Sequence, residues 1–195
     1  MSSPAYHAPP SLAEAVALLS AQPDARVLAG GTDLIVQMRA GARQPGAIVD
    51  LKRIAGLEGI RAHDGGFAIG AATPCTMLKD HAALSAAWPG VVEAANLIGS
   101  VQVRGRATMA GNLCNASPAA DSVPALVAAG ALALIAGPAG ERLVPVEQVP
   151  TGPGKTSLAA GEFIAELRLP ARPERSGDAY LRITPRTEMD IAVAG

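Results

Sequence analysis

The pattern of apolar residues predicts a helix near the start of the chain. Leu12, Val16 and Leu19 recur at the spacing of one helix face. Ser11 and Glu14 stand at the capping-box positions, where a hydroxyl and a carboxylate satisfy the exposed amides of a helix start. A helix is therefore expected to begin directly after the serine.

A βαβ unit is predicted next. The apolar runs at residues 26–29 and 47–51 indicate two short buried strands, separated by an amphipathic helix that begins at Leu34. The first strand runs directly into Gly30 and Gly31, so the turn into the helix is tight. The two strands should be parallel, with a right-handed crossover.

Strands and helices alternate further along the chain. Apolar runs and alternation predict strands at residues 66–70, 131–135, 143–146 and 163–169, the last of them half-exposed. A hairpin turn at residues 137–140 is expected to join the second and third of these strands. Helical patterns predict helices at residues 75–78, 91–98 and 124–129, the first with Thr73 as N-cap and Pro74 at its first position. Residues 99–121 are rich in Gly, Asn and Ser and indicate a long functional loop.

These elements predict an α+β protein with two lobes. The first lobe is expected over residues 1–60 and the second over residues 61–170. Residues 171–195 begin as a charged, proline-containing linker and end with the run Met189–Gly195, which resembles the start of another element. We therefore expect a further C-terminal piece that this sequence does not finish.

Composition narrows the classes of function. The chain has 195 residues, of which 49% are hydrophobic, enough for a core in one globular domain or two small ones. Its 16 Lys and Arg against 17 Asp and Glu give a net charge of −1, and only 3% of residues are aromatic. Neither a basic surface nor stacking platforms are indicated, which argues against a nucleic-acid partner.

The cysteines and the N-terminus point to a cytoplasmic protein. Cys75 and Cys114 form no CxxC or Cys-x-His pattern, so neither a zinc site nor a disulfide framework is predicted. The N-terminus has no basic segment followed by an apolar run, and proline or charge interrupts every long apolar stretch. No secretion signal and no membrane span are expected.

Two patterns that suggest catalysis do not hold. Residues 152–156 read GPGKT, but a phosphate-binding P-loop needs glycine where Val149 stands, so an ordinary surface turn is expected. The three histidines have no GxSxG serine beside them, and neither cysteine has a base at a fixed spacing. We predict no catalytic residue and no metal ligand in this chain.

The first candidate binding segment is Ala29–Leu34, which reads AGGTDL. Two glycines leave backbone amides uncovered, and the following helix N-terminus adds partial positive charge, which suits a phosphate or pyrophosphate. A tight turn capped by Thr32 or Asp33 explains the same residues equally well. The local pattern does not decide between the two.

The second candidate is residues 108–121, which read TMAGNLCNASPAAD. Its amides could face an anion while Asn112, Asn115 and Asp121 bind hydroxyl groups. The alternative is an irregular connection in which Ser117 and Asp121 cap the next helix. A polar loop in the middle of a domain modestly favours the binding site.

Four segments together resemble a known family. AGGTDL, TMAGN, NASPAAD and MDIAV follow in the order and spacing of the FAD-binding medium subunits of molybdenum hydroxylases, the xanthine dehydrogenase and carbon monoxide dehydrogenase group. The opening YHAPPSLAEAVALL is also similar to the start of that family. The resemblance implies a two-lobed FAD-binding fold of the p-cresol methylhydroxylase and vanillyl-alcohol oxidase type, with its C-terminal domain truncated here.

The resemblance also implies cofactor contacts. The residues that match the family's FAD-binding positions are Val27, Leu28, Ala29, Gly30, Gly31, Thr32, Asp33, Leu34, Ala107, Thr108, Gly111, Asn112, Asn115, Ala120, Asp121, Ile164, Arg182 and Ile191. The glycine amides would meet the pyrophosphate, Asp121 the ribose or ribityl hydroxyls, and Ile164 the adenine end. One departure is Ala110, where the family has glycine, which requires a negative φ at that position.

By resemblance, the protein is an electron-transfer subunit of an oxidoreductase complex. A large partner subunit with a molybdenum cofactor would oxidise the substrate, and a small partner with [2Fe-2S] clusters would relay electrons to the FAD and on to an external acceptor. The cysteine-rich insertion of some relatives is absent, so no cluster is expected in this chain. A self-contained flavin oxidoreductase of the same fold and a truncated, non-catalytic interaction module remain as alternatives.

Overall fold

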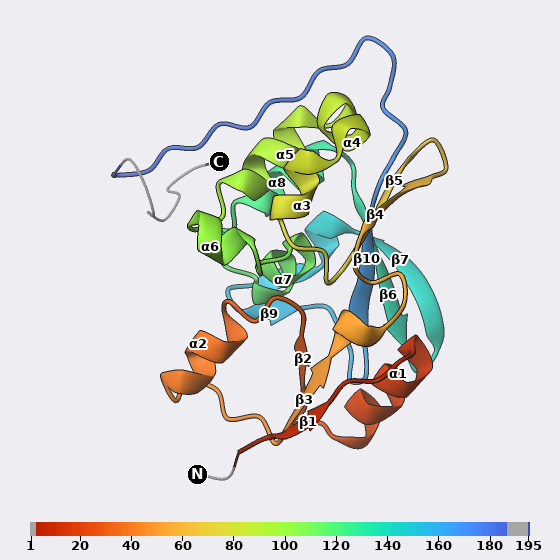
Figure 1. The fold of residues 1–195 in the computed structure, drawn as a ribbon, viewed down its shortest axis with the longest axis vertical. Coiled ribbons are helices and arrows are strands. Elements are labelled where there is room, and N and C mark those ends of the chain that lie inside the picture. Colours follow the sequence, from red (N-terminus) through yellow and green to blue (C-terminus); the bar gives the residue numbers. More distant parts are fainter. Residues whose placement is uncertain (1–2, 187–194) are drawn as a thin grey trace.

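The computed structural model describes residues 3–186 and 195, and its N-terminal part is a small parallel sheet (Figure 1). The sheet has the strand order β1-β3-β2, with β1 and β2 both parallel to the central β3. Its elements are β1 (Ala5–His7), α1 (Leu12–Ala21), β2 (Arg26–Leu28), α2 (Leu34–Arg39), β3 (Ala47–Asp50) and the 3-10 turn η1 (Leu51–Arg53). The predicted parallel βαβ unit is confirmed, while β1 was not predicted.

The predicted helix start at Ser11 is also confirmed. The Ser11 hydroxyl accepts a hydrogen bond from the Glu14 amide at 3.3 Å. Ala15 and Leu19 on α1 are buried. In contrast, α2 has no buried residue, and Val36 is 61% exposed, so α2 stands at the edge of the lobe.

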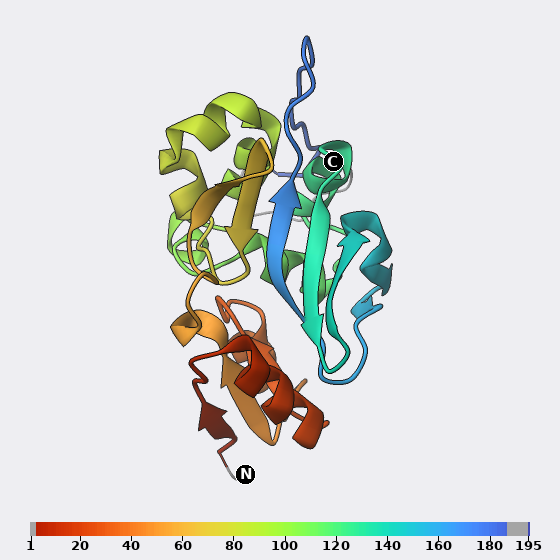
Figure 2. The same cartoon turned by 90° about the vertical axis from the view of Figure 1, so that its right-hand side faces the viewer.

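The second part of the chain is built on an antiparallel sheet with the strand order β4-β5-β10-β6-β7. In Figure 2 this sheet faces the viewer and the helices of this part lie behind it. The strands are β4 (Ile60–His63), β5 (Gly66–Gly70), β6 (Leu132–Gly137), β7 (Gly140–Pro145) and β10 (Phe163–Leu169). The predicted hairpin between β6 and β7 is confirmed.

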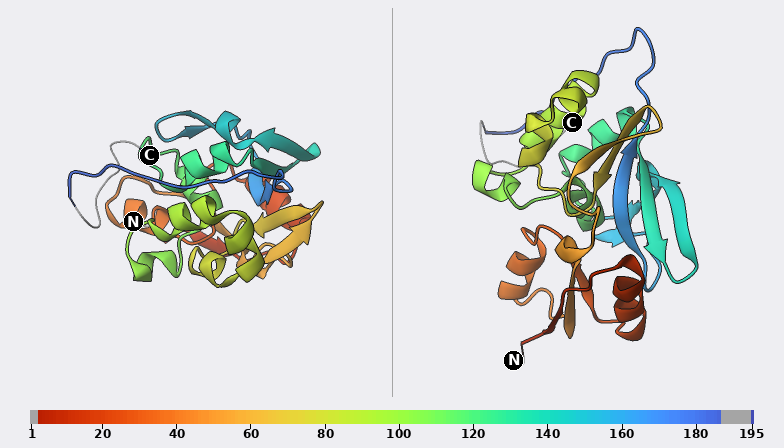
Figure 3. Two further views of the ribbon diagram at one scale, coloured as in Figure 1. Left: turned by 90° about the horizontal axis from the view of Figure 1, so that it is seen from above. Right: turned by 45° about the vertical axis from the view of Figure 1, so that its right-hand side comes forward.

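Six helices cover one face of this sheet (Figures 1 and 3). They are α3 (Thr76–Asp80), α4 (Ala82–Ala87), α5 (Pro89–Asn96), α6 (Val101–Arg104), α7 (Met109–Asn115) and α8 (Ser122–Ala128). The remaining elements are the 3-10 turn η2 (Val146–Gln148) and the small hairpin of β8 (Pro150–Gly152) and β9 (Lys155–Thr156). No helix among residues 3–186 is long and apolar enough to cross a membrane.

The predicted loop over residues 99–121 is wrong, because this stretch contains α6 and α7. Local capping explains both helices. The Ser100 hydroxyl accepts from the Val103 amide at 3.3 Å, and the Thr108 hydroxyl accepts from the Gly111 amide at 3.0 Å. Small residues then let α7 pack closely, with Met109 and Ala110 buried. The high content of Gly, Asn and Ser suggested a loop, although two short helices with serine and threonine caps form here.

Two further predictions are corrected by tertiary contacts. Thr73 is not an N-cap, because its hydroxyl donates to the Gly59 carbonyl at 3.0 Å and accepts from the Gly59 amide at 2.9 Å. The helix begins instead after Cys75. The strand at residues 163–169 is not half-exposed, because it pairs with β5 on one side and β6 on the other. Its central position buries it.

Glu166 explains why β10 looked amphipathic in the sequence. This carboxylate is 5% exposed, and it forms an ion pair with Arg61 and another, at 2.7 Å, with Arg168. A buried charge with paired hydrogen bonds is tolerated in a strand core. Charge alternation therefore marked a buried ion pair and not a solvent-facing edge.

Candidate functional site

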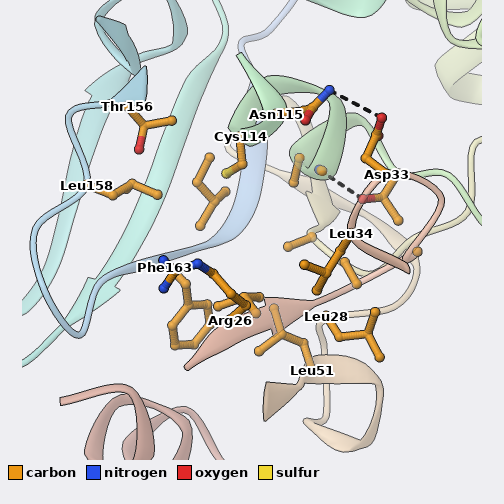
Figure 4. Close-up of a pocket in the computed structure, with 18 of the residues that line it drawn as sticks. Arg26, Leu28, Asp33, Leu34, Leu51, Cys114, Asn115, Thr156, Leu158 and Phe163 are labelled. Atoms are coloured by element: carbon orange, nitrogen blue, oxygen red, sulfur yellow. Dashed lines mark hydrogen bonds between the residues drawn. The ribbon is translucent and has the colours of Figure 1, made fainter. Parts of the chain in front are cut away.

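A cavity of about 510 Å³ lies between the two sheets, in the size range of small-molecule and cofactor sites. Three segments of the chain line it: the turn after β2, the start of α7 and the loop before β10. Figure 4 shows Asp33 and Asn115 close together on one side, with Arg26 and Phe163 near each other on another side. The two segments singled out in the sequence therefore share one pocket.

The first wall is a row of free backbone amides. None of the amides from Gly30 to Leu34 donates a hydrogen bond to another described residue, and the intrahelical bonds begin with Ile35, which donates to the Gly31 carbonyl at 3.0 Å. All five residues line the pocket. Gly31 has φ of +83°, a conformation that L side chains rarely adopt. Free amides before a helix form a ready anion site.

The second wall is the start of α7. Ala110 lies inside this helix, so its φ is negative, as the departure from glycine required. Thr108, Ala110 and Gly111 line the pocket. Asn112 also lines it, but its side-chain oxygen accepts from the Ser122 hydroxyl at 2.7 Å. That oxygen is therefore engaged in holding α7 to α8.

The two walls meet where Gly30 passes the backbone before α7. A Cβ on Gly30 would lie 2.0 Å from the Arg106 carbonyl oxygen and 3.1 Å from the Ala107 Cα. Only glycine allows this approach, because such distances lie far inside van der Waals contact. The two candidate segments of the sequence therefore face each other, which is possible because position 30 carries no side chain.

Side chains also bridge the walls. The Asn115 amide donates to the Asp33 carboxylate at 3.3 Å (Figure 4). The Asn115 oxygen accepts from the Gln37 amide at 3.2 Å. Arg43 in turn donates to the Gln37 oxygen at 2.6 Å. Desolvation by the surrounding protein raises the pKa of the Asp33 carboxyl, although the residue is exposed. Asn115 thus joins α7 to Asp33 of the first wall and to Gln37 on α2.

Replacing Asn115 with alanine should loosen this bridge. We expect an affinity for the pocket's ligand about 10-fold lower, since two hydrogen bonds that hold the walls in register are lost. Isothermal titration with FAD, the ligand that the family resemblance implies, measures the change in affinity. Asn96→Ala is the matched control, because the side chain of Asn96 makes no hydrogen bond to another described residue. Equal affinities in the two variants would contradict a bridging role.

Of the third wall, only Ile164 was predicted from the sequence. This wall consists of Gly154, Thr156 and residues 158–164. The turn at GPGKT is a hairpin at the mouth of the pocket, and the Gly154 amide donates to the Ala116 carbonyl at 3.0 Å. Arg26 on β2 also lines the pocket. The glycines of this segment were the available signal, but they were interpreted as an ordinary surface turn.

Most of the predicted site residues line this one pocket. They are Val27, Leu28, Ala29, Gly30, Gly31, Thr32, Asp33, Leu34, Ala107, Thr108, Gly111, Asn112, Asn115 and Ile164. The structure does not bring Ala120, Asp121 or Arg182 to it. Asp121 forms an ion pair with Arg182 at 2.8 Å, and Arg182 also donates to the Leu97 carbonyl. Ile191 lies outside the described residues.

The two cysteine thiols are both held in the neutral form. Burial raises the pKa of the Cys114 thiol, which lines the pocket, to about 12. Burial also raises the pKa of Cys75 to about 12. Both thiols are therefore protonated at neutral pH and poor nucleophiles. Within residues 3–186, no group of His, Cys, Asp or Glu is arranged to hold a metal ion.

Comparison with known proteins gives consistent matches over nearly the whole chain. A family model described as the FAD binding domain in molybdopterin dehydrogenase matches residues 2–172. The chain is 38% identical over 192 residues to the putative xanthine dehydrogenase FAD-binding subunit of Escherichia coli strain K12, covering 97% of this chain and 66% of the relative. The carbon monoxide dehydrogenase medium chain of Hydrogenophaga pseudoflava is 38% identical over 191 residues, with the same coverage.

Solved structures show the same fold. The carbon monoxide dehydrogenase of Hydrogenophaga pseudoflava that lacks the Mo-pyranopterin moiety matches with a TM-score of 0.92 and 36% identity. The match covers 98% of this chain and 67% of that chain. Quinoline 2-oxidoreductase from Pseudomonas putida 86 matches with a TM-score of 0.89 and 28% identity, covering 98% of this chain and 66% of that one. The chain thus spans about two thirds of the proteins it matches.

Proposed function

Because the chain belongs to the family of FAD-binding domains found in molybdopterin dehydrogenases, we propose that its pocket binds FAD. The observation that carries this proposal is the row of free amides from Gly30 to Leu34, which lines a cavity of about 510 Å³. A dianionic pyrophosphate is a ligand whose charge and oxygen acceptors such amides satisfy. The glycine at position 30 keeps the opposite wall close enough to enclose it.

The proposal assigns a part of the cofactor to each wall. The pyrophosphate lies against the amides of Gly30–Asp33 and the start of α7, and the apolar surface near Phe163 and Ile164 takes an aromatic end. Asp33 and Asn115 face the hydroxyls of a ribityl or ribose unit. We assign no such role to Asp121 and Arg182, which form an ion pair with each other and do not line the pocket.

The cofactor supplies the redox chemistry, and the residues of this chain bind and orient it. We propose that the chain is the FAD-binding part of an oxidoreductase subunit that passes electrons from iron–sulfur clusters of a small partner to an external acceptor. A large partner with a molybdenum cofactor would oxidise the substrate. The Cys114 thiol at the pocket is a poor nucleophile, which supports a binding role for the pocket residues.

The proposal includes three finer points. The fold is that of the p-cresol methylhydroxylase and vanillyl-alcohol oxidase type, with lobes at residues 1–60 and 61–170. Residues 171–195 are a linker and the start of a C-terminal domain. The compartment is the cytoplasm, which two free cysteines support, because a reducing environment keeps thiols unpaired.

Titration with FAD tests the proposal directly. The 195-residue chain should quench flavin fluorescence on binding and shift the flavin absorbance bands, with one FAD per chain. Binding of FAD without any spectral change would place the flavin ring in solvent and restrict the site to the adenosine diphosphate half. A folded chain that binds neither FAD nor ADP would overturn the proposal and favour a non-catalytic interaction module.

A turnover assay with an organic substrate and an external acceptor tests the remaining alternative, a self-contained flavin oxidoreductase. The FAD-loaded chain should not oxidise small organic substrates by itself, since the proposal gives substrate oxidation to a partner subunit with a molybdenum cofactor. Substrate oxidation by the isolated chain would instead support a self-contained flavin oxidoreductase.

A further inference from the structure

The last residue of β3, Asp50, is a buried carboxylate beside β2, the strand that leads into the turn with the free amides. Asp50 is 5% exposed. It accepts hydrogen bonds from the Tyr6 hydroxyl at 2.6 Å, the Lys52 ammonium at 2.7 Å and the Lys52 amide at 3.0 Å. Three elements therefore meet at one side chain: β1 through the tyrosine, β3, and the turn η1 through the lysine.

The carboxylate is held in its charged form. Burial alone would raise the pKa of Asp50, but the hydrogen bonds from Lys52 and Tyr6 outweigh it and hold the pKa below its usual value. The same contact raises the pKa of the Tyr6 hydroxyl. Asp50 thus provides a fixed negative charge that anchors the Lys52 ammonium.

The anchored ammonium makes one more contact. Its Nζ donates to the Ala29 carbonyl oxygen at 3.1 Å. Ala29 is the residue directly before Gly30, and register places β2 beside β3 so that Leu28 lies opposite Asp50. Lys52 itself does not line the pocket. The lysine therefore contacts the backbone of the first pocket wall at Ala29 without lining the pocket itself.

This contact fixes the direction of the first free amide. No cis peptide occurs among the described residues, so the carbonyl and the N–H of the peptide between Ala29 and Gly30 point in opposite directions. With the carbonyl held against Lys52, the Gly30 N–H points away from the lysine. Gly30 lines the pocket, and its amide has no acceptor among the described residues.

We propose that Lys52, anchored by Asp50 and Tyr6, is a positioning residue that holds the Ala29–Gly30 peptide with its N–H toward the bound pyrophosphate. The inference rests on the proposed FAD site and adds a residue that neither lines the pocket nor touches the cofactor. Glycines adopt many backbone conformations, so a turn with two of them needs an external contact to keep its amides in one direction. Preorganised donors bind an anion more tightly than donors that must reorient.

A surface ion pair would explain Lys52 differently. Exposed pairs contribute little to stability, and their loss leaves distant backbone unchanged. Here the Lys52 side chain is 28% exposed and its carboxylate partner 7%, and the third contact is a main-chain carbonyl of the binding turn. The two explanations differ in what happens to Gly30 when the lysine is removed.

The test compares Lys52→Met with Lys79→Met in the 195-residue chain. Lys79 is an exposed lysine on α3, so this control removes the same charge away from the turn. Isothermal titration measures the affinities for FAD and for ADP, which has the pyrophosphate but no flavin. Glycine-selective ¹⁵N labelling records the Gly30 amide resonance without ligand. A third variant, Asp50→Asn with Lys52→Met, avoids leaving the buried carboxylate unpaired.

We expect Lys52→Met and the double variant to bind both FAD and ADP about 10-fold more weakly than the Lys79→Met control, with a shifted Gly30 resonance in the free protein. Lys52→Arg, which keeps a cationic donor, should recover part of the affinity. Unchanged ADP affinity together with an unchanged Gly30 resonance would overturn the positioning role. Failure of the unsubstituted chain to bind FAD and ADP counts against the proposed function instead, and the Gly30 resonance then decides the positioning role by itself.

Discussion

Replacing Gly30 with alanine should lower FAD affinity at least about 100-fold and destabilise the chain by about 3 kcal/mol. The new methyl group would lie 2.0 Å from the Arg106 oxygen and 2.7 Å from the Arg106 carbonyl carbon. Both atoms belong to the backbone, so no side chain can rotate away from the contact. The two walls must separate, which moves the free amides away from the start of α7.

Gly105→Ala is the matched control for this prediction. Gly105 lies one residue before the same carbonyl, has φ of −64°, and a Cβ there would meet nothing closer than 3.5 Å. Thermal unfolding and FAD titration of both variants check the expectation. If Gly30→Ala binds FAD as tightly as Gly105→Ala, the close approach of the two walls is not needed for binding.

Local sequence signals predicted the elements that depend on local physics. The capping box at Ser11 and the glycine pair after residue 29 act within a few residues, so the helix and the tight parallel βαβ unit followed from them. The same holds for the hairpin between β6 and β7, whose turn residues stand next to each other. The family was predicted from the order and spacing of several short motifs, because no single motif identifies it.

Elements that depend on distant partners were not predictable in this way. The hydroxyl of Thr73 has a good capping position, but Gly59 is a better partner and lies 14 residues earlier in the chain. The strand at residues 163–169 looked half-exposed because its charged residue alternates with apolar ones, and only its neighbours β5 and β6 show that it is central. The alternation of polar and apolar residues shows the polarity of a strand. Its burial depends on whether other strands pair with it on both sides.

The candidate site shows the same division. Residues on the two glycine-containing segments were predicted, because free amides depend on local backbone. The wall at residues 154–164 was missed except for Ile164, since its contribution arises only when β8 and β9 fold against Ala116. Asp50 and Lys52 were missed for a related reason: no local pattern shows that Tyr6 and Ala29 are their partners.

Replacing Asp50 with alanine should have the second-largest effect, a loss of about 3 kcal/mol in the free energy of unfolding at pH 7. The change leaves the Tyr6 hydroxyl and the Lys52 ammonium without their common acceptor. For a chain of this length, the midpoint of thermal unfolding should fall by about 6–12 °C. The exposed Asp80→Ala is the control and should unfold like the unsubstituted chain.

The pH dependence identifies the charge as the cause. Because the folded-state pKa of Asp50 lies below the unfolded value of about 3.9, its stabilisation is complete well above that pH and is lost as the pH falls through the folded-state pKa. The difference in unfolding free energy between the unsubstituted chain and Asp50→Ala should therefore be constant from pH 7 to about pH 5 and narrow below about pH 4. Asp50→Asn should retain part of the stability, since its oxygen still accepts from Tyr6. Urea unfolding at each pH measures these differences, and a gap that stays constant down to about pH 2 would show that packing, not the ionised carboxylate, stabilises this end of β3.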